Sequence, residues 1–220
     1  MMKALSALNT LHQTGLFGNY QNKNESELTT VSEIKNIKII QLVHYKKSNI
    51  KISSINLENL KFPDEPMSLN SNKETRVLWN GPNNWIVVSF NKDILNNINK
   101  ICDEKNFAIT DLSHSRTVIE LKGKNIKEIL KKGCPINFNE FKLNNCANSV
   151  FHGITITIDM TNDNPETFRI FALRSFGESL YHSITDACLE DGYRGILNFA
   201  IWLFQQDITK AFTFFTSNII

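Results

Sequence analysis

The sequence predicts an α+β protein with antiparallel or mixed sheets. Short runs rich in β-branched residues recur along the chain, turn-forming Gly, Pro and Asn residues separate them, and fewer stretches show helical spacing. The 220 residues are 41% hydrophobic and 21% charged, which is enough apolar material for a sizeable core and unlike a disordered chain. The formal net charge of +2 does not favour a polyanionic partner, so no nucleic-acid binding is expected.

The first 35 residues differ from the rest. Residues 18–33 are almost entirely polar, so residues 1–35 are predicted to be a flexible or surface-running arm. Asn36–Tyr45 is dense in β-branched residues and predicts the first strand of a main domain that spans residues 36–192. Apolar residues continue less regularly as far as Leu57, and Pro63 then breaks the chain.

A β-β-α-β unit is predicted from residue 76 onward. Arg76–Trp79 and Trp85–Phe90 are strand-like runs joined by Asn, Gly and Pro, which predicts a hairpin. Asn91–Glu104 carries apolar residues at helical spacing, and Phe107–Ile109 returns to a strand pattern.

The second half repeats this logic in a different order. Strands are predicted at Thr117–Leu121, Val150–Ile158 and Phe168–Leu173, and a helix is predicted at Asn125–Lys132. A final helix, residues 175–190, is predicted to begin with a capping box formed by Ser175 and Glu178. The pattern therefore indicates two ferredoxin-like βαβ-type units, with no repeat at the level of sequence.

The cysteines and the N-terminus indicate a cytoplasmic protein. The four cysteines stand singly, without the spacing of a metal site, and are expected to be reduced thiols. The N-terminus lacks the apolar core of a secretory signal. The most apolar run, residues 195–204, is well short of the ~20 residues that span a bilayer, so no membrane segment is expected.

The densest group of reactive side chains is the run from Asp111 to Arg116. It follows one predicted strand and precedes the next, so Asp111, Ser113 and Arg116 could form a catalytic or ligand-binding loop. The alternative is structural: Asp111 and Ser113 would bond amides of the turn, and Arg116 would pair with a carboxylate. Arg174, just before the last helix, could likewise face an anion or form a structural ion pair. Nucleotide-binding, serine-hydrolase and zinc-protease motifs are missing, so no catalytic residue and no metal ligand is assigned.

Five stretches together resemble the gamma subunit of heterotetrameric sarcosine oxidase. They are Trp79–Ser89, Ala108–Arg116, Leu121–Gly123, Leu130–Phe138 and Arg174–Leu180. Their order and spacing over residues 76–192 carry the resemblance. The family's fold is a reduced form of the folate-binding fold of aminomethyltransferases, the T-protein of glycine cleavage, and the resemblance implies that fold here.

The resemblance also implies a function. In that family the complex oxidatively demethylates sarcosine to glycine, a reaction linked to tetrahydrofolate. FAD, FMN, NAD, zinc and the folate site belong to the other subunits, and gamma is a non-catalytic structural subunit. This implies that the chain holds no cofactor itself and that its partners are alpha, beta and delta subunits.

Two other functions stay open from the sequence. A related folate-binding family acts in iron–sulfur protein maturation and carries a Lys-Gly-Cys motif that continues into an aromatic residue, Gly, Gln and Glu. Lys132-Gly133-Cys134 matches the start of this motif, but Pro135-Ile136-Asn137 follows, so the motif is incomplete. In that alternative a stand-alone protein would bind folate with the Asp111–Arg116 loop and Arg174. The third possibility is a general α+β interaction domain with an unrelated partner.

The C-terminal tail, residues 193–220, has no recognised counterpart in the gamma family. It is rich in large apolar side chains and is predicted to form short helices that pack back on the domain or dock on another chain. The candidate interface residues are Trp202, Phe204, Phe212 and Phe215.

Overall fold

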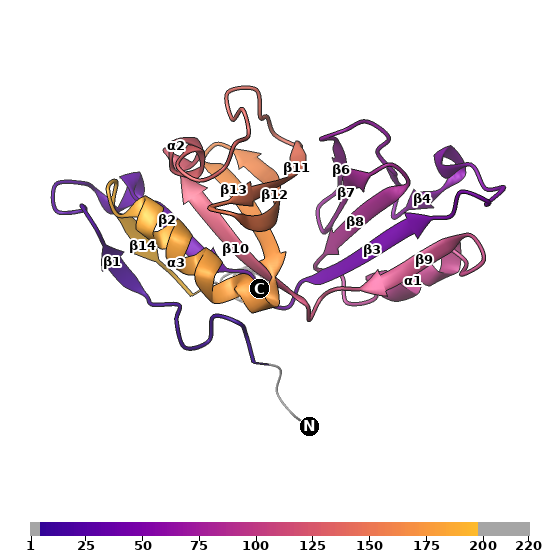
Figure 1. The fold of residues 1–220 in the computed structure, drawn as a ribbon, viewed down its shortest axis with the longest axis horizontal. Helices are drawn as coiled ribbons and strands as arrows, with labels where there is room; N and C mark the ends of the chain where they lie inside the picture. Colours follow the sequence, from indigo (N-terminus) through magenta and orange to yellow (C-terminus); the bar gives the residue numbers. More distant parts are fainter. Residues whose placement is uncertain (1–4, 198–220) are drawn as a thin grey trace, which may run out of the picture.

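The computed structural model describes residues 5–197, which form two main β-sheets that diverge as a V (Figure 1). Sheet A has the strand order β1 (Gly15–Phe17), β14 (Tyr193–Gly195), β2 (Thr29–Glu33), β10 (Arg116–Gly123), β13 (Glu166–Leu173), β12 (Ile154–Asp163), β11 (Cys146–Phe151). Sheet B has the order β6 (Leu69–Ser71), β7 (Thr75–Gly81), β8 (Asn84–Ser89), β3 (Lys38–His44), β9 (Phe107–Asp111). A small hairpin pairs β4 (Asn56–Leu57) with β5 (Leu60–Lys61).

Within residues 5–197, three α-helices accompany the sheets. They are α1 (Ile94–Ile101) beside sheet B, and α2 (Ile126–Lys131) and α3 (Gly177–Cys188) on sheet A. Single 3₁₀ turns occur at Glu25–Glu27, Ile52–Ser54 and Arg174–Phe176. Neighbouring strands pair antiparallel in both sheets, except that β14 runs parallel to β2. The predicted α+β class with antiparallel or mixed sheets is confirmed.

The central strands of both sheets are buried on two faces, which explains consecutive buried apolar residues such as Trp85–Val88 in β8. In β10, Val118 contributes to a cluster between the sheets, whereas its neighbour Ile119 faces the helices of sheet A. In β3, Ile39 faces the same middle cluster and Ile40 faces α1. Successive side chains of a strand point to opposite faces, so one strand contributes side chains to two hydrophobic clusters.

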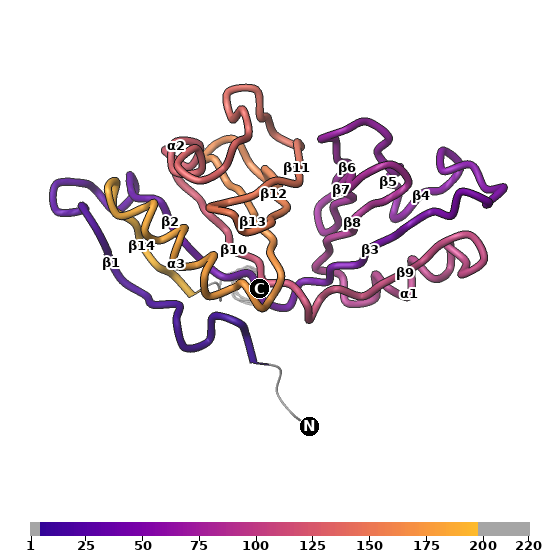
Figure 2. The backbone as a smooth tube through the Cα atoms, in the orientation of Figure 1, coloured from indigo at the N-terminus to yellow at the C-terminus, as the bar shows by residue number. Residues whose placement is uncertain are grey.

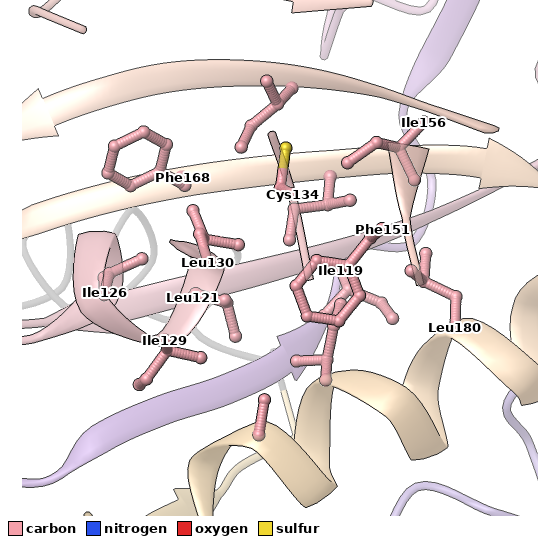
Figure 3. Close-up of a cluster of buried hydrophobic side chains, with 14 of the residues drawn as sticks. Ile119, Leu121, Ile126, Ile129, Leu130, Cys134, Phe151, Ile156, Phe168 and Leu180 are labelled. Carbon is pink, nitrogen blue, oxygen red and sulfur yellow. The ribbon is translucent and has the colours of Figure 1, made fainter. Parts of the chain in front are cut away.

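The core of sheet A lies between its strands and α2 and α3. Ile126 and Ile129 of α2 and Leu180 of α3 are fully buried there against Ile119 and Leu121, as Figure 3 shows. Spacing of three to four residues places such side chains on one face of each helix, so each helix covers the sheet with a single apolar stripe.

A buried ion pair links the two sheets. Arg76 on β7 of sheet B contacts Asp159 on β12 of sheet A through both carboxylate oxygens, with Nε–Oδ2 2.8 Å and Nη2–Oδ1 2.7 Å. Nη2 also donates to the Met160 carbonyl at 3.1 Å. Asp159 is completely buried, and the bidentate geometry supplies the charge-assisted bonds that a buried carboxylate requires.

The prediction that residues 1–35 form an arm is wrong for a large part of that segment. β1 and β2 are strands of sheet A, and the tube in Figure 2 shows them beside β14 from the other end of the chain. Leu8 and Val31 are fully buried. The composition of this segment does not reveal its strands, because few apolar residues are enough when the neighbouring strands supply the rest of the core. The domain therefore begins before residue 36.

The domain also continues beyond residue 192. Tyr193 is buried and lies in β14, so the predicted tail begins as a strand rather than a helix. The sheet offers β14 two neighbours, β1 and β2, and this pairing decides its conformation. The predicted helices and the candidates Trp202, Phe204, Phe212 and Phe215 lie outside the described residues.

Two local predictions in the second half are also wrong. Residues 150–158 do not form one strand, because His152 and Gly153 adopt positive φ values of 46° and 83° and turn the chain from β11 into β12. At the last helix, Ser175 lies in a 3₁₀ turn, the cap residue of α3 is Phe176, and no side-chain capping bond forms there. The extra turn displaces the start of the α-helix past the Ser-x-x-Glu motif.

Candidate functional site: a basic cavity between the sheets

A cavity of about 620 Å³ lies where the chain passes between the two sheets. Its walls come from the segment before β1, the crossing from β2 to β3, and the connection from β9 to β10. Of the predicted loop residues, Ser113 and Arg116 line the cavity and Asp111 does not. Arg174, which precedes α3, completes the wall together with Lys92. The fold thus brings Ser113, Arg116 and Arg174 to one cavity, although Arg174 is far from the other two in sequence.

The loop from β9 to β10 is held by its own polar side chains. Asp111 Oδ1 accepts a hydrogen bond from the Ser113 amide at 2.9 Å, which is the predicted turn contact. Ser113 Oγ in turn accepts from the Ile39 amide of sheet B at 3.0 Å. Lys38 lies 3.8 Å from Asp111 Oδ2. The predicted bond to an amide of the turn is thus formed by Asp111, whereas Ser113 bonds an amide of β3 instead.

The pKa of Asp111 reflects this environment. Burial alone would raise the pKa, but the hydrogen bonds from Ser113 and the charges of Lys38 and His114 outweigh it and lower the pKa below its ordinary value. A carboxylate held in the charged form is suited to fixing a loop and poorly suited to accepting a proton near neutral pH.

Arg116 does not form the predicted ion pair with a carboxylate among residues 5–197. Its Nη1 has only two contacts of 3.5 Å, to the carbonyl and the hydroxyl of the adjacent Ser115. Burial lowers the pKa of Arg116, because the partly desolvated guanidinium has lost water without gaining a counter-charge. Arg174 donates through Nη2 to the Leu5 carbonyl, and so closes the cavity against the N-terminal segment.

Cations dominate the lining of the cavity. Within the described part of the chain, five basic side chains and one carboxylate, Glu33, line it; the basic residues are Lys35, Lys38, Lys92, Arg116 and Arg174. Lys35 lies 3.3 Å from Glu33 and Lys38 lies 3.8 Å from Asp111, so Lys92, Arg116 and Arg174 are the cations of the lining without a carboxylate partner among the described residues. Apolar residues of the lining, Ile34, Ile39 and Val118, provide an uncharged wall.

Sequence reasoning missed the three lysines. Lys35 lies in the crossing after β2, Lys38 begins β3, and Lys92 lies in the loop between β8 and α1. They become neighbours only when β2 and β3 lie beside the β9–β10 loop. No local motif joins Lys35 and Lys92, which are 57 positions apart in the sequence.

The cysteine thiols are structural. All four are buried, and burial raises the pKa of Cys102 to about 11 and that of Cys146 and Cys188 to about 12. Cys134, of the Lys-Gly-Cys motif, donates a weak hydrogen bond to Ser149 Oγ at 3.4 Å inside the core of sheet A. Protonated, enclosed thiols are poor nucleophiles and poor metal ligands.

The described residues contain neither a metal-binding cluster nor a membrane-spanning helix. Among residues 5–197, His, Cys, Asp and Glu side chains do not gather in groups of three that could hold a metal ion. Within the same residues, no helix has both the length and the apolar character to cross a membrane.

The chain shares its fold with two solved proteins. A chain of the heterotetrameric sarcosine oxidase from Corynebacterium sp. U-96 matches 84% of this chain and 96% of its own length, with a TM-score of 0.71 and 20% identity. Aminomethyltransferase T of the glycine cleavage system from Bartonella henselae matches 83% of this chain and 57% of its own, with a TM-score of 0.57 and 10% identity. The predicted aminomethyltransferase-like fold is confirmed.

Sequence comparison identifies the family. Sarcosine oxidase subunit gamma from Corynebacterium sp. (strain U-96) is 28% identical over 119 residues, which are 53% of this chain and 57% of the relative. The chain thus spans little more than half the length of this curated relative. The family model for the sarcosine oxidase gamma subunit matches residues 57–190, from the small hairpin of the sheet-B half to the end of α3. The chain therefore belongs to the sarcosine oxidase, gamma subunit family.

Proposed function

We propose that this chain is the gamma subunit of a heterotetrameric sarcosine oxidase-like complex and that it acts as a non-catalytic assembly subunit. The family match over residues 57–190 is the observation that carries the proposal. In this proposal the alpha, beta and delta subunits are its cytoplasmic partners. They hold the FAD, FMN, NAD, zinc and tetrahydrofolate with which the complex demethylates sarcosine oxidatively.

The side chains of the described residues support an assembly role. Asp111 and Ser113, the strongest candidates for chemistry, are bonded to backbone amides and fix the β9–β10 loop on sheet B. The cysteines are enclosed in the protein cores. These groups stabilise a rigid body, which is the property that a scaffold subunit needs.

An exposed apolar surface gives the proposal a location for a partner. Leu173 and Phe176, on either side of Arg174 at the start of α3, are 44% and 47% exposed, and Leu5, whose carbonyl contacts Arg174, is 67% exposed. Contiguous apolar side chains on a surface mark a protein interface more often than isolated ones do. We assign this Leu5–Leu173–Phe176 surface to the contact with another subunit.

The test is co-purification of the full chain from its own cells, followed by mass spectrometry and an absorbance scan for flavin. The expected result is a flavin-bearing assembly that oxidises sarcosine, whereas the chain purified alone is colourless and inactive. Flavin bound to the isolated chain, or sarcosine oxidation by it, would contradict the non-catalytic role. A chain that elutes from the extract without any flavoprotein would overturn the subunit assignment.

Two variants locate the interface within the same experiment. Phe176→Ser is expected to reduce the recovered assembly at least tenfold while leaving the chain folded. Leu143→Ser removes a side chain that is 40% exposed in the loop before β11, and it is expected to leave recovery unchanged. Equal recovery of the two variants would show that the Leu5–Leu173–Phe176 surface is not the contact.

A further inference from the structure

We propose that the basic cavity between the two sheets is a binding site for a small organic dianion, carboxylate or phosphate, with an apolar body. This inference does not depend on the proposed assembly, because every group that carries it belongs to this chain. The volume of about 620 Å³ lies within the range of small-molecule sites, which is ~300–1,000 Å³.

The charge balance of the walls determines the sign of the ligand. Glu33 is compensated at 3.3 Å by Lys35. Asp111, adjacent to the cavity, has Lys38 at 3.8 Å. Arg116, Lys92 and Arg174 line the cavity and have no carboxylate partner within 4.0 Å among the described residues. Arg174 Nη2 is bonded to the Leu5 carbonyl, which leaves Arg116 and Lys92 to face a ligand. Two uncompensated cations facing one cavity favour a ligand with two negative charges.

Arg116 is the anchor of the proposed site. Its guanidinium is partly buried, and its contacts to Ser115 are at the 3.5 Å limit of hydrogen bonding, so its donors remain available. A planar fork of N–H donors fits two oxygens of one carboxylate or phosphate at once. A bound anion would supply the counter-charge that the partly buried guanidinium lacks.

The walls of the cavity are already fixed, which lowers the entropic cost of binding. Ser113 and the Ile39 amide hold the β9–β10 loop to sheet B, and the Arg174 amide donates to the Ser115 carbonyl at 2.9 Å and so holds its other end to β13. Ile34, Ile39 and Val118 are buried residues of the lining and would contact the apolar body of the ligand. A site whose groups are held before binding needs little rearrangement.

The experiment is isothermal titration calorimetry of the full chain with two matched probes, phthalate and phenyl phosphate. Each joins a benzene ring to two negative charges, carried by two carboxylates in phthalate and by one phosphate in phenyl phosphate, so the stronger binder shows which chemistry is preferred. Malonate and inorganic phosphate, which lack the ring, are expected to bind at least fivefold more weakly. If neither aromatic probe binds at 10 mM, the site does not exist and the proposal fails.

Variants separate a built site from general attraction to a basic surface. Arg116→Gln is expected to weaken binding at least tenfold and Lys92→Gln several-fold. Lys100→Gln, an exposed position on α1 outside the cavity, removes the same charge and is expected to change binding less than twofold. Equal losses for Arg116→Gln and Lys100→Gln would overturn the proposal. Circular dichroism checks that each variant is folded, and Arg116→Lys, which keeps the charge without the fork, is expected to fall between the wild type and Arg116→Gln.

Discussion

The two halves of the molecule use the same layers but differ in how the chain supplies them. The strands of the sheet-B half all come from one continuous stretch of the chain, residues 38–111. The sheet-A half combines residues 15–33, 116–173 and 193–195, and its strands β1, β2 and β14 come from opposite ends of the described chain. Contacts between distant segments close long loops and form late, so the sheet-A half depends more on its terminal strands.

The largest expected effect tests whether the halves are one cooperative unit. Arg76→Ala leaves the completely buried Asp159 carboxylate without its partner, and it is expected to lower the free energy of unfolding by about 3–5 kcal/mol. Urea unfolding followed by both fluorescence and circular dichroism measures the loss, and two separated transitions would show that the pair couples the halves.

Arg194→Ala is the matched control. Arg194 pairs with Glu25 at 2.8 Å, a similarly short distance, but both side chains are exposed, so a loss of about 0–1 kcal/mol is expected. A loss for Arg76→Ala no larger than this would show that the buried pair does not link the sheets.

The second prediction concerns the dependence of the sheet-A half on the N-terminal segment. Leu8→Ala is expected to cost about 2–5 kcal/mol of unfolding free energy, because Leu8 is fully buried in the core of sheet A. Leu5→Ala, three residues away and 67% exposed, is expected to change the stability by less than about 0.5 kcal/mol. Chemical denaturation measures the free energy of unfolding of both variants. Equal small losses would support the interpretation of the N-terminal segment as an arm.

The amount of the fold that could be predicted follows the same division. The hairpin of β7 and β8 was predicted from local runs of residues, because its two strands are close in sequence. Helix α1 and strand β9 were predicted because each has a clear pattern of its own, although β9 pairs with the distant β3. β2 and β14 were missed because Thr29–Glu33 and Tyr193–Gly195 have weak patterns of their own and take their conformation from distant neighbours. Asp111, Ser113, Arg116 and Arg174 could be selected by residue type. The lysines of the cavity could not, since only the tertiary fold brings them together.

A third prediction is specific to the sheet-B half and to acid. Burial would raise the pKa of Glu58, but hydrogen bonds from Thr75, Asn97 and Asn91 outweigh it and lower the pKa below 4.5. A lowered pKa means that the charged form stabilises the folded state above the unfolded pKa and that this contribution is lost as pH falls below about 4.5 toward the folded value.

Glu58→Gln tests this dependence. The variant is expected to lose about 1 kcal/mol at neutral pH and to show a shallower decrease in stability between pH 5 and 3 than the wild type. The pKa of Asp111 is also lowered, but Asp111 is present in both the wild type and the variant. The difference between their two curves of stability against pH therefore isolates the contribution of Glu58. Parallel curves would show that Glu58 has no part in acid unfolding.

The smallest expected signal is the reaction of the thiols with a disulfide reagent at pH 8. Cys102 reports on the sheet-B half and Cys188 on the sheet-A half, and both are buried with raised pKa values of about 11 and 12. The native chain is expected to react at less than one hundredth of the rate of the urea-unfolded chain. Mass spectrometry of partly labelled protein then shows which half opens first, and fast labelling of either thiol in the native state would contradict its enclosure.

The crossings between the sheets have a consequence for the topology of the whole chain. β2 and β10 are direct neighbours, with Glu33 paired opposite Ile119 and the Ile34 amide bonded to the Val118 carbonyl at 2.9 Å. The chain thus leaves sheet A and re-enters it at adjacent positions, so the entire sheet-B half is inserted at the tip of what would otherwise be a simple β-hairpin. Excising it would leave the strand register of sheet A intact, and would uncover the apolar face that the two sheets now share.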